Sequence, residues 1–322
     1  MLALEKIYAP VWNELEQVRA IVAERWTEAL QLVYGAEAKP PETGGKLLRP
    51  ALCLISAGAA GAQRLDHFVN LASGMEMLHV AALVHDDVVD GSDTRRGQRS
   101  LKAQWDNRTA VLGGDYIMAR AIVMMGSYNS CGVIINAVES ICQMASGELR
   151  NFGTRHHEPT PEQCIDLARG KTGSLFAVTC STPVLLIDEG YREVMERYGM
   201  ALGVAFQLID DVLDLCQPET ALGKPSCGDI VEGKRTLPIL YLRDGLDQPD
   251  RARLLAMEGA EISEDDREWV ASAMEATGAR EHTETLARQY AAEARAALEE
   301  LPASPYRDSM ANLADFVLAR GA

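Results

Sequence analysis

Apolar residues recur at a spacing of three or four along almost the whole chain, and this helical period is the strongest constraint on its fold. A first helix face is formed by the apolar residues at 11, 15, 18, 22, 26, 30 and 33. No segment shows the apolar–polar alternation of a half-buried strand. The pattern therefore predicts an all-α protein, a single large helical domain over residues 1–322, with helices near 48–60, 66–90, 109–126, 129–151, 161–174, 175–187, 190–216 and 236–244.

Two helix starts can be located from local signals. Thr160 is followed by Pro161 and, at the third helical position, Gln163, which is close to a capping box. Ser263 precedes an acidic first turn. The stretch 217–235, rich in glycine and proline, is expected to be irregular and functional, and the charged, Ala-rich sequence after 245 to form amphipathic surface helices.

Composition narrows the classes of function. Hydrophobic residues make up 47% of the 322 positions, enough for a large core, and 47 acidic against 31 basic residues give a net charge of −16. This balance argues against nucleic acid as a partner. The seven cysteines contain no C-x-x-C pair, so neither a disulfide framework nor a zinc site is expected. With no signal peptide and no transmembrane segment in the sequence, we expect a cytoplasmic protein with reduced thiols.

Two D-D-x-x-D motifs end apolar helical stretches. The first contains Asp86, Asp87 and Asp90, and the second contains Asp210, Asp211 and Asp214. On a helix the first and last aspartates of each motif share a face, where like charges repel. This arrangement gives a folded protein no stability, and its occurrence twice in one chain therefore indicates a function. Magnesium, which binds one or two carboxylates together with phosphate oxygens, supplies the missing positive charge; Mn²⁺ is the alternative.

Basic residues near these motifs have the chemistry to bind further phosphate. They lie beside glycine-rich turns or helix starts, where free backbone N–H groups also favour anions. Taken singly, each of these residues is more often an ordinary surface charge. The candidates are Lys46 and Arg49, Arg95 and Arg96, Lys171 with the hydroxyl of Thr172, and Lys224 with Lys234.

With these motifs assembled, the chain resembles the all-trans polyprenyl (isoprenyl) diphosphate synthase family, and most closely its long-chain, octaprenyl-like members. The resemblance covers about residues 40–245, with a weaker match in the tail FVLAR at 316–320, and rests on GGKLLRP, EMLHVAALVHDDVVDGSDTRRG, VLGGDYIMARA, SGEL, KTGSLF, FQLIDDVLD and GKPSCGDIVEGKRTLPI. It implies helices around a deep central cavity, a homodimer, and a Mg²⁺-dependent prenyltransferase. Such an enzyme condenses isopentenyl diphosphate with an allylic diphosphate. One departure is Asn151, next to Arg150, where relatives commonly have Gln or Asp.

The resemblance also implies a role for each candidate residue. The six aspartates would bind the metal ions that hold the allylic diphosphate. Arg95, Lys171, Lys224 and Lys234 would contact that diphosphate, and Lys46, Arg49, His79 and Arg96 would bind isopentenyl diphosphate. Thr172 and Gln207 would line the reacting centre. The residues taken as catalytic are Asp86, Asp87, Asp90, Arg95, Lys171, Asp210 and Asp211.

Product length depends on what stands one turn before the first motif. Family members with short products resemble each other in having an aromatic residue there, whereas this chain has Ala81 and Ala82. Two alanines predict an open cavity and a product longer than twenty carbons, with Tyr116, Met124 or Met125 as the deeper floor. The alternative is that the alanines only allow close helix packing. A farnesyl or geranylgeranyl diphosphate synthase, a terpene cyclase and a non-catalytic subunit of a heteromeric synthase are the competing functions.

Overall fold

The computed structural model describes residues 4–33, 46–95, 98–154, 159–218 and 226–320. Helices dominate these residues, as the period predicts. A short antiparallel pair, β1 (Thr94–Arg95) and β2 (Gln98–Arg99), is the one departure from the expectation of no strands. The α-helices are α1 (Leu4–Tyr8), α2 (Trp12–Gln31), α3 (Leu48–Ala59), α4 (Val69–Val89), α5 (Leu101–Gln104), α6 (Asn107–Gly126), α7 (Cys131–Thr154), α8 (Pro161–Ala168), α9 (Ser174–Ser181), α10 (Arg192–Cys216), α12 (Gly228–Val231), α13 (Leu237–Gly245), α14 (Gln248–Ala256), α15 (Glu264–Ala276), α16 (Ala279–Ala297) and α17 (Pro305–Ala319).

Shorter helical turns join these helices. They are the 3₁₀ turns η1 (Ala9–Val11), η2 (Leu65–Phe68), η4 (Pro183–Leu186), η5 (Glu189–Tyr191) and η6 (Leu298–Glu300), and the π-helical turn η3 (Arg169–Gly173). The predicted helix 161–174 is therefore divided at Ala168, and the predicted helix 175–187 becomes α9 followed by η4. The short helix α12 forms within the stretch expected to be irregular.

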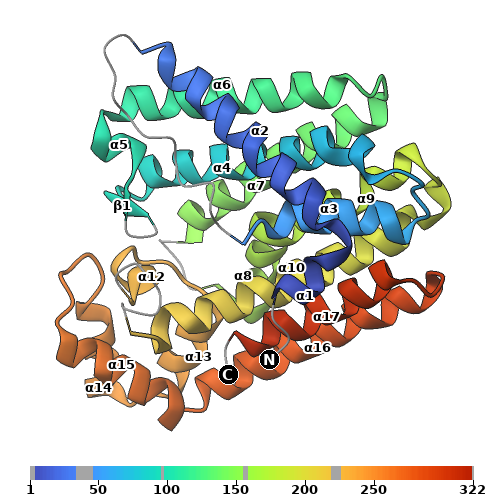
Figure 1. The fold of residues 1–322 in the computed structure, drawn as a ribbon. Coiled ribbons are helices and arrows are strands. Elements are labelled where there is room, and N and C mark those ends of the chain that lie inside the picture. Colours follow the sequence, from blue (N-terminus) through green and yellow to red (C-terminus); the bar gives the residue numbers. More distant parts are fainter. Residues whose placement is uncertain (1–3, 34–45, 96–97, 155–158, 219–225, 321–322) are drawn as a thin grey trace.

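Helix α10 is central to the architecture. It packs against α9, α16 and α17, while α4 packs against α2, α3 and α6 (Figure 1). The main core buries large side chains from several of these helices, among them Trp26, Phe176 and Tyr198. The Tyr198 hydroxyl donates a hydrogen bond to the carbonyl of Met310 at 2.8 Å, which ties α10 to α17 within the core.

A second, smaller hydrophobic cluster lies at one end of the molecule, where α12, α13, α14 and α15 gather (Figure 1). Its buried members include Ile230, Leu242, Val270 and Met274. Leu215, in the last turn of α10, also belongs to this cluster. The second aspartate motif therefore lies where α10 passes from the main core to the smaller one.

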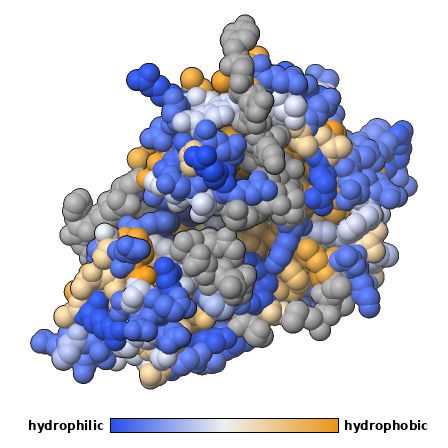
Figure 2. Space-filling model, turned by 60° about the vertical axis from the view of Figure 1, so that its left-hand side comes forward, coloured by the Kyte–Doolittle hydropathy of each residue, from blue (hydrophilic) through white to orange (hydrophobic). Residues whose placement is uncertain are grey.

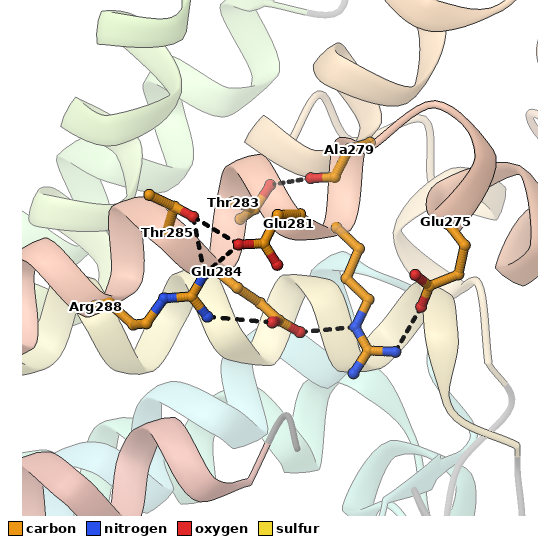
Figure 3. Close-up of polar contacts among 8 residues, drawn as sticks. Glu275, Ala279, Glu281, Thr283, Glu284, Thr285 and Arg288 are labelled. Carbon is orange, nitrogen blue, oxygen red and sulfur yellow. Dashed lines mark hydrogen bonds and ion pairs between the residues drawn. The ribbon is translucent and has the colours of Figure 1, made fainter.

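The helices after residue 245 are more deeply packed than the surface helices expected from their composition. Helix α16 turns a row of alanines inward, with Ala287, Ala291 and Ala294 buried, and packs along α10. Its outer face carries ion pairs (Figure 3). Arg280 contacts Glu284, one turn along the helix, at 2.7 Å and also Glu275 on α15 at 2.7 Å, and Arg288 contacts Glu281 at 2.6 Å.

Two local features fix where the functional residues lie. The predicted capping box at Thr160 is present, with Gln163, and starts α8 just before η3. The backbone of η3 then runs very close to α10: a Cβ added at Gly203 would lie 2.7 Å from the Cα of Gly173. Glycine at both positions permits this approach, which carries the side chains of η3 toward those of α10.

The surface is mixed in character. In the view of Figure 2, hydrophilic residues cover most of the periphery and hydrophobic residues gather toward the middle.

Among the described residues, no helix has both the length and the apolar character needed to cross a membrane. All seven cysteines are free thiols.

Candidate active site

A pocket opens between η3, α10 and the segment that follows α12. Its empty space, including the mouth, is about 540 Å³. Charged side chains of both signs face it, three acidic and three basic, so the pocket is built for a polar, charged ligand at this end. Its lining residues are Gly147, Glu148, Cys164, Leu167, Ala168, Lys171, Gln207, Asp211, Asp229, Lys234, Arg235 and Thr236.

The first aspartate motif adjoins this pocket through two lysines. Asp86 Oδ2 lies 3.8 Å from Lys171 Nζ, and Asp90 Oδ2 lies 3.4 Å from Lys234 Nζ. Asp87, which lies between these two aspartates in the sequence, is buried, with 3% of its surface exposed. The structure thus brings the end of α4 to residues 85 and 144 positions further along the chain, as the sequence motifs predict.

The second motif has a different set of partners. Asp211 Oδ1 accepts a hydrogen bond from Gln207 Nε2 at 2.7 Å, and Gln207 Oε1 in turn accepts one from the Thr172 hydroxyl at 2.5 Å. Asp214 Oδ2 accepts the backbone N–H of Asp229 at 3.0 Å. A chain of hydrogen bonds therefore runs from η3 through Gln207 to the carboxylate of Asp211, while Asp214 anchors the start of α12.

Asp210 and Asp214 were expected to face together, but they have separate partners. Asp210 Oδ1 accepts a hydrogen bond from Arg320 Nη2 at 2.6 Å. Asp214 as a whole residue is 3% exposed, whereas the side chain of Asp210 is 44% exposed. The difference arises because α12 folds back over Asp214 and supplies a backbone donor there.

Burial and charge set the protonation behaviour of the pocket. Burial raises the pKa of Asp211 well above its usual range, and the nearby Asp229 carboxylate raises it further. Burial alone would lower the pKa of Lys171 and of Lys234, but the carboxylates around each outweigh it, so both pKa values are raised and both lysines stay charged. Burial raises the pKa of the Cys164 thiol to about 12, which excludes a reactive thiolate at neutral pH.

The other predicted residues are spread over two helices and a turn. Lys46 and Arg49 flank the start of α3, where the Lys46 ammonium lies 5.2 Å from the centre of the Phe316 ring and the Arg49 guanidinium 5.0 Å from that of Phe176. His79 is half-buried in α4. Arg95 lies on β1, but its side chain is outside what the structure describes, as are residues Arg96 and Lys224. Asn151 and Arg150 lie in α7.

Sequence reasoning gave no role to three residues that contact the site. Glu148 forms an ion pair with Lys171, Asp229 lies 3.7 Å from Lys234, and Arg320 contacts Asp210. Glu148 and Asp229 lie inside motifs that carried the resemblance, which was the available signal. Arg320 lies in the short C-terminal stretch that extends the resemblance, but that stretch does not indicate its pairing with a residue 110 positions away.

Comparison with known proteins agrees with this geometry. The family model "Polyprenyl synthetase" matches residues 32–276. The chain belongs to the polyprenyl synthetase family. It is 34% identical to the all-trans-nonaprenyl-diphosphate synthase (geranyl-diphosphate specific) of Rhodobacter capsulatus, over 98% of each chain. It is 35% identical to the octaprenyl diphosphate synthase of Escherichia coli K12, over 98% of this chain and 99% of that one.

A solved structure shows the same fold. The polyprenyl synthase of Caulobacter crescentus, in complex with calcium and isoprenyl diphosphate, superposes with a TM-score of 0.88 at 31% identity, over 99% of this chain and 98% of that one. Family membership makes this chain an enzyme of isoprenoid biosynthesis, a prenyltransferase that elongates prenyl diphosphates. The all-α isoprenoid synthase fold expected from the resemblance is confirmed.

Proposed function

We propose that this prenyltransferase binds an allylic diphosphate between its two aspartate motifs, with divalent cations, and condenses it with isopentenyl diphosphate. The observation that carries the proposal is the pair of lysines at the pocket. Lys171 and Lys234 both line it, and each also reaches one carboxylate of the first motif. A diphosphate placed there meets two ammonium groups while the carboxylates become available for cations.

The donor chemistry fits Mg²⁺, or Mn²⁺. Asp86, Asp87 and Asp90 on one side, and Asp210, Asp211 and Asp214 on the other, offer only hard carboxylate oxygens. Within the described ranges, no three His, Cys, Asp or Glu side chains gather closely enough to hold a metal alone. That suits a cation that completes its coordination with phosphate oxygens and water. The Caulobacter crescentus relative, solved with calcium and isoprenyl diphosphate, supports this choice.

When bound, the cations neutralise charge on the diphosphate oxygens and make diphosphate a better leaving group. The remaining work falls to the chain's own residues. Lys171 and Lys234 stabilise the negative charge that develops as the allylic C–O bond breaks. The bonding electrons leave with diphosphate, the alkene of isopentenyl diphosphate attacks the allylic carbon, and the resulting cation loses a proton to the released diphosphate. The hydrogen-bonded pair Thr172 and Gln207 lines the place where this occurs.

The second substrate needs its own anion site. We assign its diphosphate to Lys46, Arg49 and His79, with Arg96, and assign Arg95 and Lys224 to the allylic diphosphate. Lys46 and Arg49 flank the start of α3, where the positive end of the helix dipole adds to their charge.

The product is proposed to be longer than twenty carbons. Ala81 is buried and Ala82 half-buried on α4, one turn before the first motif. Two turns before Ala81, Gly74 is covered by Met125, since a Cβ at Gly74 would lie 2.7 Å from Met125 Cε. Among the three floor residues considered, Met125 is therefore favoured. The octaprenyl and nonaprenyl names of the relatives support a long product.

Ala81→Phe tests the proposal that the small side chains on α4 allow a long product. The added ring is expected to shorten the product, measured by chromatography of the dephosphorylated chains. An unchanged chain length would mean that the alanines serve only helix packing.

A homodimer is proposed from an exposed apolar face on α6 and α7, which pack against each other. Leu112 and Val123 on α6 are 68% and 65% exposed. On α7, Ile135, Val138 and Leu149 follow one stripe at heptad spacing and are also exposed. A second copy of the same face, related by a two-fold axis, is the occupant that such a self-complementary stripe fits.

Sedimentation of the double variant Val138→Glu/Leu149→Glu tests this interface. The variant is expected to sediment as a monomer, whereas Leu255→Glu, which alters an exposed leucine of α14, should leave the mass unchanged. A double variant with the wild-type mass would refute the assignment.

The free thiols agree with a cytoplasmic location, which we also propose.

Metal dependence is tested with the full chain, isopentenyl diphosphate and an allylic primer. Turnover is expected with Mg²⁺ or Mn²⁺ and should vanish with a chelator. Turnover that survives chelation would overturn the metal assignment. Absence of turnover under every condition would favour a non-catalytic subunit.

A further inference from the structure

Arg320 places a full positive charge on a carboxylate oxygen that is also a proposed metal ligand. Its Nη2 lies 2.6 Å from Asp210 Oδ1. The guanidinium also stacks on Phe206, with 4.5 Å between its central carbon and the ring centre. Phe206 and Asp210 are one turn apart on α10, so the Arg320 side chain lies along one face of that helix.

The other carboxylates of the second motif each accept a hydrogen bond from a group that carries no net charge. Asp211 accepts from the Gln207 amide, and Asp214 from the backbone N–H of Asp229. A neutral donor can remain in place while a cation binds the same carboxylate. A guanidinium cannot share the Asp210 oxygen with a divalent cation without strong like-charge repulsion.

We infer that Arg320 is a stand-in cation: it neutralises Asp210 while the site is free of metal and must leave that oxygen when a metal ion binds. This inference rests on the proposed function. The position suits exchange, because Asp210 is 44% exposed on its side chain and can be reached from solvent. The guanidinium would keep its contact with Phe206 as it moves. The Nη1 of Arg320 is buried without a hydrogen-bond partner among the described residues, so the ion pair with Asp210 does not use every donor of the guanidinium.

The exchange also connects the metal to the end of α17. Arg320 follows the last residue of that helix, and Phe316, one turn earlier, lies under the Lys46 ammonium at 5.2 Å. Release of Arg320 therefore loosens the helix end that contacts a residue assigned to the second substrate. Arg320 is a positioning residue in this account, since it acts through Asp210.

The test is titration of Mn²⁺ into the full-length protein in the presence of saturating inorganic diphosphate, with free Mn²⁺ measured by electron paramagnetic resonance. Arg320→Gln removes the competing charge and should tighten Mn²⁺ binding by about two- to five-fold, the range expected for loss of a partly exposed ion pair. Arg320→Lys keeps the charge and should bind as the wild type does. Unchanged or weaker binding in Arg320→Gln would overturn the inference.

Two further variants separate this inference from the proposed function. Arg295→Gln is the matched control, since it breaks another 2.6 Å arginine–aspartate pair, between Arg295 on α16 and Asp315 on α17, away from the pocket. It should not change Mn²⁺ binding. Asp210→Asn should weaken it. If Asp210→Asn weakens binding and Arg320→Gln does nothing, only the stand-in role fails; if Asp210→Asn has no effect, Asp210 is not a metal ligand.

A measurement on the wild type covers the case in which the Arg320 variants do not fold. Hydrogen exchange of the backbone amides in the last turn of α17 should become faster when Mn²⁺ and diphosphate are added. Exchange that stays the same or slows would contradict release of Arg320.

Discussion

The two aspartate motifs have the same spacing but are held in different ways. In the first, Asp86 and Asp90 face the ammonium groups of Lys171 and Lys234, which are themselves assigned to the diphosphate. In the second, Asp211 and Asp214 are buried and accept hydrogen bonds from the Gln207 amide and the Asp229 backbone N–H. Under the proposed function, the first motif would therefore exchange its lysine partners when substrate binds, whereas Asp211 and Asp214 would keep these hydrogen bonds.

The largest expected effect is on the first motif. Asp86→Ala should lower turnover by at least about a hundredfold, the scale seen when one electrostatic contact to a transition state is lost. Folding should survive, because the Lys171 ion pair is partly exposed and worth at most about 1 kcal/mol. Steady-state kinetics and thermal unfolding measure the two effects.

Asp166→Ala is the matched control for that variant, since Asp166 is an exposed aspartate of α8 paired with Arg169. It should keep wild-type turnover. Near-normal activity of Asp86→Ala would remove the metal role of the first motif.

The free energy of unfolding, in contrast to turnover, should fall more for a variant of the second motif than for one of the first. Asp214→Ala leaves the backbone N–H of Asp229 without its acceptor and should lower the free energy of unfolding by about 1–3 kcal/mol. Asp90→Ala should cost less, because Lys234 keeps Asp229 and Glu232 as partners. Chemical denaturation of both variants gives the comparison; equal losses would mean that the second motif is no more preformed than the first.

The raised pKa of Asp211 predicts a pH dependence of the metal-free protein. Because the folded-state pKa lies above the unfolded-state value, the group favours folding below the unfolded pKa, and this contribution is lost as pH rises through the folded pKa. Asp211→Asn should therefore raise the melting temperature near neutral pH while abolishing turnover. The gain should shrink as pH falls toward the ordinary range of an aspartate.

Thermal scans in chelator between pH 4 and 8 test this, with Asp210→Asn as the exposed neighbour for comparison. A variant at Asp211 that is less stable than the wild type at every pH would show that its carboxylate is charged and satisfied in the folded protein.

The smallest effect is expected at Cys164, which lines the pocket beside the second motif. Its Sγ donates a hydrogen bond to the Arg235 carbonyl at 3.3 Å, and its pKa of about 12 keeps the thiol protonated. Cys164→Ala should change turnover by less than about threefold, since only one weak hydrogen bond is lost. A loss of several orders of magnitude would give the thiol a chemical role that its environment does not support.

Most of the fold could be predicted from helical periodicity, because core-facing apolar residues repeat strictly within each helix. The capping box at Thr160 was also local and readable. The π-turn η3 was not, since it depends on the close approach of Gly173 to Gly203 on another helix. The amphipathic character of α16 was readable, but its partner was not, because a row of alanines does not indicate which helix packs against it.

The motifs indicated four residues that line the pocket, Lys171, Gln207, Asp211 and Lys234, but not how each is paired. The bridges from Lys171 to Asp86 and from Lys234 to Asp90 follow from motifs, while the different partners of Asp210 and Asp214 depend on where α12 and α17 end. These contacts join distant segments, and no periodicity within either segment encodes them.

The central claim is that the pocket elongates an allylic diphosphate into a long all-trans chain with the help of divalent cations. The most direct measurement incubates the protein with Mg²⁺, labelled isopentenyl diphosphate and, separately, geranyl, farnesyl and geranylgeranyl diphosphate, and then sizes the products. The account predicts all-trans products longer than twenty carbons from at least one primer. Products that stop at farnesyl or geranylgeranyl diphosphate, or no product from any primer, would contradict it.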